Sequence, residues 1–214
     1  MSDPRFIVVE GPIGVGKTTL AHRLAETFGS ELLLEGAEEN PFLERFYLNP
    51  REAALPTQMF FLFQRARQMQ ALRQGDMFEP VRVSDFMLEK DRLFATLTLD
   101  SDELRLYEQA YELLTLDAPT PDLVIYLQAP VEVLQQRVAR RGRRGEERMV
   151  ADYLRSVSDA YARFFYDYDS APLLIVNAAE IDLAASDKDY IMLLEQIREV
   201  KCGRHYFNPI PSML

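Results

Sequence analysis

Five short apolar runs, rich in Val, Ile and Leu, recur along the 214-residue chain. They occupy residues 6–9, 31–34, 81–84, 123–127 and 173–176. Runs that are apolar at almost every position are typical of strands buried on both faces, and the segments between them carry helical periodicity. The alternation predicts an α/β fold, in which helices cover both faces of a five-stranded parallel sheet.

Hydrophobic residues make up 48% of the chain, which is enough for one full core. No repeat or composition shift divides the sequence, so we expect a single domain over residues 1–214. The tail after Lys201 contains Pro209 and Pro211 and is expected to be irregular.

An aromatic-rich helix is predicted over residues 56–74, inside a connection that is long for one crossover. One side of it carries Phe60, Phe63, Ala66 and Arg67, and another carries Gln58, Leu62, Arg65 and Met69. A glutamine and an arginine two turns apart on an apolar side suit the edge of a planar heterocycle. The alternative is that both are solvated, since these residue types are mostly exposed.

A glycine-rich segment follows directly on the first apolar run. Residues 11–18 read GPIGVGKT and fit the phosphate-binding pattern G-x-x-x-x-G-K-[ST], called the P-loop below. In this motif backbone N–H groups surround phosphate, the lysine reaches the β- and γ-phosphates, and the hydroxyl can ligate Mg²⁺. A strand before it and an amphipathic helix after it supply the required context. The residues predicted to bind ATP are Gly11, Gly14, Val15, Gly16, Lys17, Thr18 and Thr19.

The net charge and the composition limit the kinds of partner that the protein can bind. A formal net charge of −10 argues against nucleic acid as a lasting partner, because phosphate backbones need a basic face. No apolar run approaches the length of about 18 residues that spans a membrane. The single cysteine, Cys202, fits a reducing compartment, and few residues precede the first strand for a signal peptide, so we expect the cytoplasm.

Arginine is concentrated late in the chain: six of the 24 Lys and Arg residues lie between Arg137 and Arg148. A helix from about Val131 leads into this cluster, and Gly142 and Gly145 break it. The pattern predicts an Arg-rich lid over about 137–148, whose guanidinium groups close on a transferring phosphoryl group. A solvated basic loop is the alternative.

Three polar residues follow the first three predicted strands, where ligands of open α/β sheets bind. They are Lys17, Glu35 and Asp85. Phosphoryl transfer needs Mg²⁺ and a group that accepts the proton of the attacking hydroxyl. Glu35 is placed to be that base, and Asp85 with Thr18 to hold Mg²⁺, directly or through water. For either carboxylate alone, a capping or turn role is the alternative.

Several motifs in combination resemble the deoxynucleoside kinases, most closely their bacterial deoxyadenosine/deoxyguanosine-kinase-like branch. The resemblance runs from the P-loop to about Val176. It rests on the P-loop, Glu35, the stretch NPFLERFY at 40–47, the helix at 56–65, Phe94-Ala95, Pro121-Asp122-Leu123, and Arg141-Gly142-Arg143 followed by Glu146-Glu147.

The resemblance implies roles for individual residues. Glu35 corresponds to the base that deprotonates the nucleoside 5′-hydroxyl, and Tyr47 and Glu146 to the pair that holds the sugar 3′-hydroxyl. Gln58 corresponds to a hydrogen-bonding partner of the base, with Arg65 as a second contact. The remaining implied positions are Leu43, Phe46 and Thr57 in the base pocket, and Arg137, Arg141 and Arg143 in the lid. The family also implies a homodimer and a purine acceptor, deoxyadenosine first.

One segment departs from the family pattern. After the third strand the family shows an acid, then Arg, then a second acid that contacts the base, whereas here Phe86 follows Asp85. Lys90 or Arg92 are candidates for the missing cation. Glu89, Lys90 and Asp91 compete for the position of the second acid.

Two other functions stay open at this stage. A nucleoside monophosphate kinase, similar to thymidylate kinase, would need cations in the acceptor pocket, for which Arg45, Arg51 and Arg65 are available. A nucleotide-sensing module would bind ATP or dATP without turnover, and the departure at Phe86 is its best support.

Overall fold

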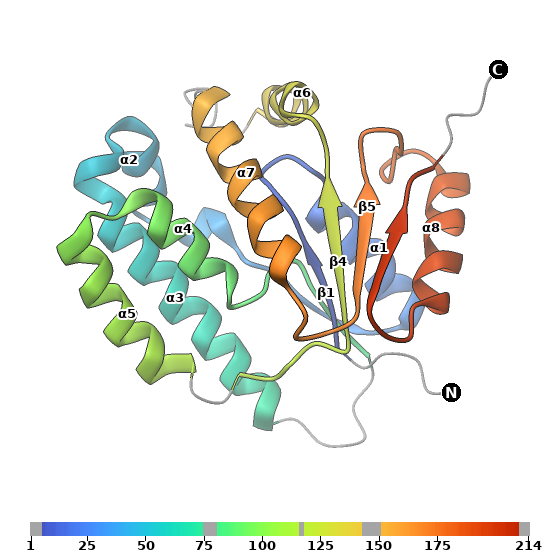
Figure 1. Cartoon of the computed structure of the whole chain (residues 1–214), viewed down its shortest axis with the longest axis horizontal. Helices are drawn as coiled ribbons and strands as arrows, with labels where there is room; N and C mark the ends of the chain where they lie inside the picture. Colours follow the sequence, from blue (N-terminus) through green and yellow to red (C-terminus); the bar gives the residue numbers. More distant parts are fainter. Residues whose placement is uncertain (1–5, 75–80, 116–117, 143–150, 210–214) are drawn as a thin grey trace.

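The structure is a computed structural model that describes residues 6–74, 81–115, 118–142 and 151–209 (Figure 1). Its centre is a parallel sheet in the strand order β2-β3-β1-β4-β5-β6. The strands are β1 (Phe6–Glu10), β2 (Glu31–Leu33), β3 (Arg82–Ser84), β4 (Leu123–Gln128), β5 (Leu173–Asn177) and β6 (Arg204–Phe207). The α/β architecture and the first five strands are confirmed, each within one residue at either end.

The sixth strand corrects two expectations, the strand number and the irregular tail. Residues 204–207 pair in parallel with β5, with Leu173 opposite Arg204 and Val176 opposite Phe207. Three of the four residues of β6 are exposed. Because β6 lies at the sheet edge and is polar, it lacks the apolar run that marks a buried strand.

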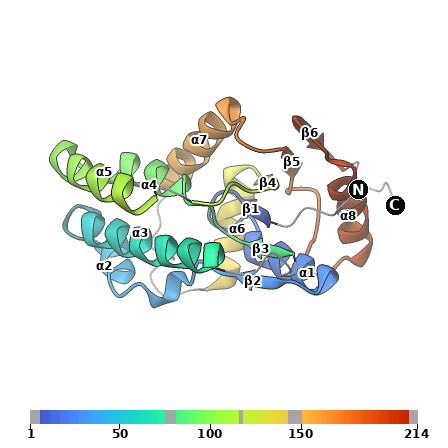
Figure 2. The same cartoon turned by 90° about the horizontal axis from the view of Figure 1, so that it is seen from below.

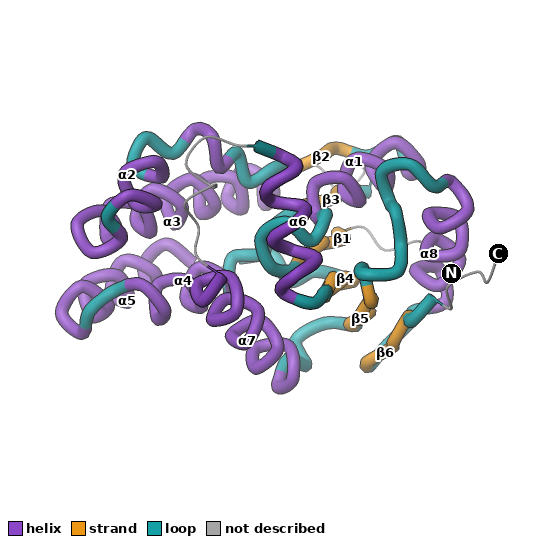
Figure 3. The backbone as a smooth tube through the Cα atoms, turned by 90° about the horizontal axis from the view of Figure 1, so that it is seen from above, coloured by secondary structure: helices purple, strands orange, loops and turns teal. Residues whose placement is uncertain are grey.

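Helices enclose the sheet on both faces (Figures 1 and 3). They are α1 (Lys17–Phe28), α2 (Leu43–Leu48), α3 (Pro50–Gln74), α4 (Lys90–Thr98), α5 (Ser101–Thr115), α6 (Val131–Arg141), α7 (Ala151–Asp167) and α8 (Asp187–Glu199), with a 3₁₀ turn at Ala37–Glu39. None of the helices in the described part of the chain is long and apolar enough to cross a membrane.

Alternate residues of the central strands point to opposite faces of the sheet. Ile7 and Val9 belong to a core cluster with Leu20 and Leu24 of α1 and with residues of α8. Val8 belongs to a second cluster with Tyr161 and other residues of α7. Both clusters are almost fully buried, so each strand is covered on both sides, as its apolar run predicts.

Beside the sheet, α3, α4 and α5 form a helical layer with a core of its own (Figure 2). This core includes Leu62, Met69, Ala95 and Tyr107. Phe86, which follows β3, is fully buried in the same core. The layer therefore packs against the chain where β3 ends.

Helix α3 is longer than predicted, because it begins at Pro50 rather than at Pro56. Proline is well tolerated in a first turn, and Pro56 lies inside the helix, where it removes one backbone hydrogen bond. Gln58 and Arg65 are 3% and 2% exposed, so the solvated alternative for this pair is wrong.

Candidate active site

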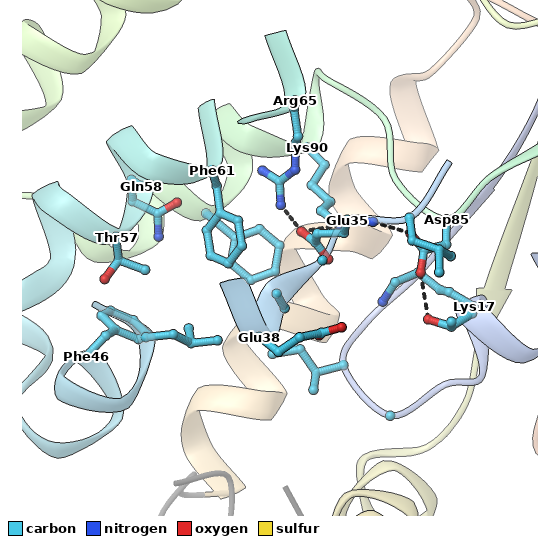
Figure 4. Close-up of a pocket in the computed structure, with 18 of the residues that line it drawn as sticks. Lys17, Glu35, Glu38, Phe46, Thr57, Gln58, Phe61, Arg65, Asp85 and Lys90 are labelled. Atoms are coloured by element: carbon cyan, nitrogen blue, oxygen red, sulfur yellow. Dashed lines mark hydrogen bonds and ion pairs between the residues drawn. The ribbon is translucent and has the colours of Figure 1, made fainter. Parts of the chain in front are cut away.

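Lys17, Glu35 and Asp85 follow three different strands and line one cavity at the carboxyl ends of β1, β2 and β3 (Figure 4). The same cavity reaches along α3 to Gln58 and Phe61. The predicted convergence of these three side chains is therefore confirmed.

The P-loop takes a conformation that its glycines permit. Gly14 and Gly16 have φ of 84° and 109°, values that residues with a side chain rarely adopt. A Cβ atom on Gly14 would lie 2.8 Å from Val138 Cγ2 and 3.0 Å from the Leu134 carbonyl oxygen of α6. The loop ends at the N-terminus of α1, where backbone N–H groups and the helix dipole favour phosphate.

The Lys17 ammonium lies inside the P-loop. It donates to the carbonyl oxygens of Gly11 at 2.7 Å and Pro12 at 3.2 Å. Burial, followed by the positive charge of Lys90, lowers the pKa of Lys17 to about 8. A phosphate anion bound here would add to the negative charges of Glu10 and Asp85 and favour the ammonium form.

Thr18 and Asp85 form a pair of oxygen ligands. Thr18 Oγ1 donates to Asp85 Oδ2 at 2.6 Å, and Asp85 Oδ1 accepts from the Glu35 backbone N–H at 2.8 Å. Mg²⁺ prefers oxygen donors and is commonly bound through one or two carboxylates together with phosphate oxygens and water. The pair fits such an ion. The described residues contain no group of three or more His, Cys, Asp or Glu side chains for a metal held by the protein alone.

Glu35 lies between two cations. Its Oε1 accepts from Arg65 Nη2 and lies 3.1 Å from Lys90 Nζ (Figure 4). The Glu35 side chain is 20% exposed, whereas those of Arg65 and Lys90 are 3% exposed. Two positive charges at one oxygen favour the carboxylate form, which a general base requires.

The end of the cavity along α3 is mostly aromatic and apolar. It contains the predicted pocket residues Leu43, Phe46, Tyr47, Thr57 and Gln58, together with Phe61, Phe94 and Tyr153. Thr57 is buried, and its hydroxyl has no hydrogen-bond partner within the described part of the chain. Gln58 Nε2 donates to Thr98 Oγ1 at 3.3 Å. An apolar slot with a few polar groups is typical of sites for planar heterocycles.

Arg65 also forms an ion pair with Asp91, whose side chain is fully buried. This contact distinguishes the three candidates for the second acid. Glu89 lies on the other side of α4, in a surface groove with Arg92 and Arg163, and Lys90 contacts Glu35. Asp91 is thus the acid that meets the arginine of the acceptor pocket.

The two candidates for the missing cation are also separated. Arg92 is half exposed and pairs with Glu108 on the surface. Lys90 is buried and lines the cavity. Phe86 itself points into the core of the helical layer, so of the two candidates only Lys90, at the start of α4, reaches the described cavity.

A second cavity adjoins the P-loop on the side of α6. It is lined by Gly14, Val15, Gly16, Lys17, Thr18 and Thr19, by Arg137, Arg140 and Arg141, and by the loop at 178–184. Six of the seven residues predicted to bind ATP line this cavity. The seventh, Gly11, lies in the same loop, where its carbonyl oxygen accepts from Lys17.

The predicted lid arginines differ in their surroundings. Arg141 lines both cavities at the end of α6. Arg137 instead donates to the carbonyl oxygens of Val15 at 3.1 Å and Ala178 at 2.8 Å, and so ties α6 to the P-loop. Its role on the phosphoryl group stays a prediction. Arg143 and Glu146 lie outside the described residues, as does the second half of the predicted lid, residues 143–148.

Glu10 is a charged residue of the site that the sequence patterns missed. It is fully buried at the end of β1, and its carboxylate accepts from the backbone N–H groups of Gly11 and Met87, both at 2.9 Å. Tyr161 O–H donates to it at 3.0 Å. A glutamate that closes an otherwise apolar strand immediately before a P-loop was the available signal.

Known proteins of one family resemble this chain in sequence and in fold. The family model described as "Deoxynucleoside kinase" matches residues 7–201. A protein named deoxyguanosine kinase from Bacillus subtilis (strain 168) is 33% identical over 209 residues, covering 94% of this chain and 99% of that protein. A protein named deoxyadenosine kinase from Lactobacillus acidophilus is 28% identical, covering 91% and 95%.

A solved structure of a deoxyadenosine kinase from M. mycoides with bound dATP shares the fold. Its TM-score is 0.77 at 23% sequence identity, and the similarity covers 91% of this chain and all of that one. The P-loop kinase fold predicted from the sequence is therefore confirmed. The chain belongs to the deoxynucleoside kinase family, whose members transfer a phosphoryl group from ATP to a deoxynucleoside.

Proposed function

We propose that this kinase transfers the γ-phosphate of ATP to the 5′-hydroxyl of a purine deoxynucleoside, with Glu35 as the general base. The carrying observation is the place of Glu35 between the P-loop and the acceptor pocket. Its backbone N–H is bonded to Asp85, and its carboxylate to Arg65 of the pocket. A hydroxyl next to Glu35 is therefore close to the phosphate site.

On the donor side, the P-loop and the start of α1 bind the phosphates, and Lys17 adds a positive charge at the β- and γ-phosphates. Thr18 and Asp85 are proposed to hold Mg²⁺, which would neutralise charge on the phosphate oxygens. Arg137, Arg141 and Arg143 are proposed to face the transferring group from the lid.

On the acceptor side, the apolar slot around Phe46 and Phe61 is proposed to hold the base, and Gln58 to pair with its edge. The amide of glutamine matches the donor and acceptor atoms on the edge of adenine. Arg65 is already paired with Glu35 and Asp91, so fewer of its N–H groups are available to donate hydrogen bonds to guanine. These contacts favour deoxyadenosine, while the relatives named for deoxyguanosine and deoxyadenosine support a purine in general.

Tyr47 lines the cavity and is proposed to bind the sugar 3′-hydroxyl together with Glu146. We further propose a homodimer in the cytoplasm, with no nucleic acid or membrane as a partner. The net charge of −10 supports the exclusion of nucleic acid.

A monophosphate acceptor is less compatible with this pocket. Arg45 and Arg51 are exposed, and neither lines the described cavity. Arg65 does line it but contacts two carboxylates. An acceptor phosphate would therefore lie near the negative charge of Glu35, and none of these three arginines would be available to neutralise it.

A radiolabelled transfer assay with ATP and Mg²⁺ tests the proposal. The acceptors are the four deoxynucleosides, their ribose counterparts and the four deoxynucleoside monophosphates. We expect transfer to purine deoxynucleosides, with deoxyadenosine preferred. Transfer only to monophosphates would replace the proposal with a nucleotide kinase, and ATP binding without any transfer would support a sensor.

A further inference from the structure

Lys90 is a buried cation within the site, and the proposed reaction has so far assigned it no role. It is the first residue of α4, and its side chain is 3% exposed. Its Nζ lies 3.1 Å from Glu35 Oε1 and 3.5 Å from Glu10 Oε1. It thus bridges the proposed base and the carboxylate beneath the P-loop.

Stability alone does not account for a lysine at this position. A cation in the first turn of a helix faces the positive end of the helix dipole. Burial removes the ammonium from water, and the charges of Arg65 and Lys17 lie nearby. Two carboxylates offset these costs, but a buried ion pair is commonly no more stabilising than apolar residues of similar size.

The contacts of Glu35 indicate what the lysine does. Arg65 and Lys90 both meet Oε1 of Glu35. Within the described part of the chain, Oε2 has no such contact. Two cations on one oxygen fix the rotation of the carboxylate and leave the other oxygen available to a hydroxyl.

Lys90 also connects this carboxylate to the donor side. Its second neighbour, Glu10, accepts a hydrogen bond from the backbone N–H of Gly11, the first residue of the P-loop. The base and the phosphate-binding loop are therefore held to one buried side chain. Phosphoryl transfer depends on this relative placement, and a displacement of about 1 Å can cost about 10²-fold in rate.

We propose that Lys90 is the positioning residue of the proposed base: it holds Glu35 Oε1 so that Oε2 faces the acceptor hydroxyl. The inference rests on the proposed function. In the step itself, the hydroxyl proton passes to Glu35 Oε2, the acceptor oxygen bonds to the γ-phosphorus, and the bond from that phosphorus to the β,γ-bridging oxygen breaks to leave ADP. Lys90 keeps its protons throughout.

The test compares Lys90→Met, Lys90→Arg and a matched control, Arg92→Met, in full-length protein. Arg92 lies two residues along the same helix but pairs with Glu108 on the surface. Single-turnover phosphoryl transfer from ATP and Mg²⁺ to the preferred deoxynucleoside isolates the chemical step from product release. ATP affinity and the melting temperature are measured for each variant.

We expect Lys90→Met to slow transfer by about 10²-fold while its ATP affinity is retained and its melting temperature does not fall below that of wild type. Lys90→Arg should restore the rate to within about tenfold of wild type, because guanidinium also binds carboxylate. Arg92→Met should stay within about twofold, as is usual for surface changes. In a Glu35→Gln background, Lys90→Met should cause little further loss, since the lysine acts through Glu35.

Wild-type transfer rates in Lys90→Met would overturn the proposal, as would equal losses in the Met and Arg variants. A full additional loss in the Glu35→Gln background would assign Lys90 a role independent of the base. If Lys90→Met does not fold, the Arg variant carries the test, and a loss of about 10²-fold there counts against the proposal. A wild-type protein that phosphorylates no deoxynucleoside would instead overturn the proposed function itself.

Discussion

Acidic and basic side chains lie next to one another at the cavity. In the described part of the chain Lys17, Glu35, Arg65, Asp85 and Lys90 line it, and the buried carboxylates of Glu10 and Asp91 pair with Lys90 and Arg65 behind them. Most are nearly inaccessible to solvent, so each depends on its neighbours for compensation. The consequences differ from residue to residue, because some carboxylates have several donors and others mainly one.

Asp91 belongs to the second kind. Its carboxylate is fully buried, and the contact described for it is the ion pair with Arg65. Replacement by Leu leaves Arg65 with one carboxylate instead of two. We expect Asp91→Leu to lower the free energy of unfolding by about 3–5 kcal/mol, the usual cost of breaking a buried pair. Urea denaturation measures it, and a loss below about 1 kcal/mol would contradict the buried pair.

Lys90 should behave differently. Glu10 keeps three other hydrogen-bond donors and Glu35 keeps Arg65, so Lys90→Met leaves neither carboxylate uncompensated. Burial lowers the pKa of Lys90 from 10.5 to about 8 despite the opposing charge of Glu10. The charged groups that face it from the surrounding elements are Glu10, Glu35, Arg65, Asp85 and Lys17.

The sign of the pH dependence follows from this lowered pKa. Between about pH 8 and 10.5 the unfolded chain retains a proton that folded Lys90 has lost, so wild-type stability rises through this range. Lys90→Met lacks this linkage. We expect the variant to be more stable than wild type at pH 7 by on the order of 1–3 kcal/mol, with a gain that shrinks toward pH 10. Thermal unfolding at several pH values checks this, and a gain that grows with pH would refute it.

Single residues also mark the limit of prediction from sequence. Glu35 and Asp85 follow strands, so topology alone brings them together. The choice among Glu89, Lys90 and Asp91 depends on the direction each takes from the first turn of α4, which no periodicity specifies. The burial of Arg65 was likewise hidden, because arginine is mostly exposed and becomes buried only when partners such as Asp91 surround it.

At the scale of elements, the contact between the P-loop and α6 connects the donor site to the Arg-rich helix. Gly14 packs against Val138 so closely that no side chain fits between them. Arg137 of the same helix donates to the carbonyl oxygen of Val15. A change in the position of α6 therefore alters the P-loop directly.

Gly14→Ala tests this connection. Its Cβ would lie 2.8 Å from Val138 Cγ2, and the φ of 84° is unfavourable for alanine. We expect ATP affinity to fall by at least about tenfold, because the displaced loop loses its aligned N–H groups.

Gly29→Ala is the matched control. Gly29 has a φ of 58° at the end of α1, but its Cβ would meet open space. The strain there should cost about 1–2 kcal/mol of stability without a change in ATP affinity. Equal losses of ATP affinity in both variants, measured by calorimetry, would show that backbone strain alone is responsible.

Helices and strands were predictable where their burial requires a clear pattern of apolar residues in the sequence. The five apolar strands could be read directly, and the periodicity of α3 placed Gln58 and Leu62 on one side without deciding whether its polar residues are buried. Strand β6 could not, since Arg204, His205 and Tyr206 are exposed and the strand is held mainly by its pairing with β5. The start of α3 was placed late because a proline inside a helix resembles a proline that begins one.

At the scale of the whole molecule, the layer of α3, α4 and α5 lies beside the sheet (Figure 2). The proposed donor site lies at the ends of the strands, and much of the proposed acceptor pocket lies along this layer. Glu35 and Lys90 lie where the two meet, and Asp85 links Glu35 to Thr18 of α1. Catalysis in this arrangement depends on the fixed relation between two packed units rather than on either alone.

The helical layer also presents apolar side chains to solvent. Phe63 of α3 is 49% exposed, and Leu106 and Leu113 of α5 are 55% and 76% exposed. Such residues are compatible with the homodimer that the family implies. Sedimentation at micromolar concentration should give twice the chain mass of 24.7 kDa. A species of one chain mass would contradict the dimer and leave the proposed chemistry untouched.

The role of Glu35 as the general base is tested by comparing single-turnover phosphoryl transfer by wild type, Glu35→Gln and a control, Glu39→Gln. Glu39 is exposed and pairs with Gln64 outside the reacting groups. With ATP, Mg²⁺ and deoxyadenosine, we predict transfer by wild type and the control. Glu35→Gln should lose about 10²–10⁴-fold in rate and still bind ATP. Full activity in Glu35→Gln would contradict the assignment of Glu35 as the base on which the account depends.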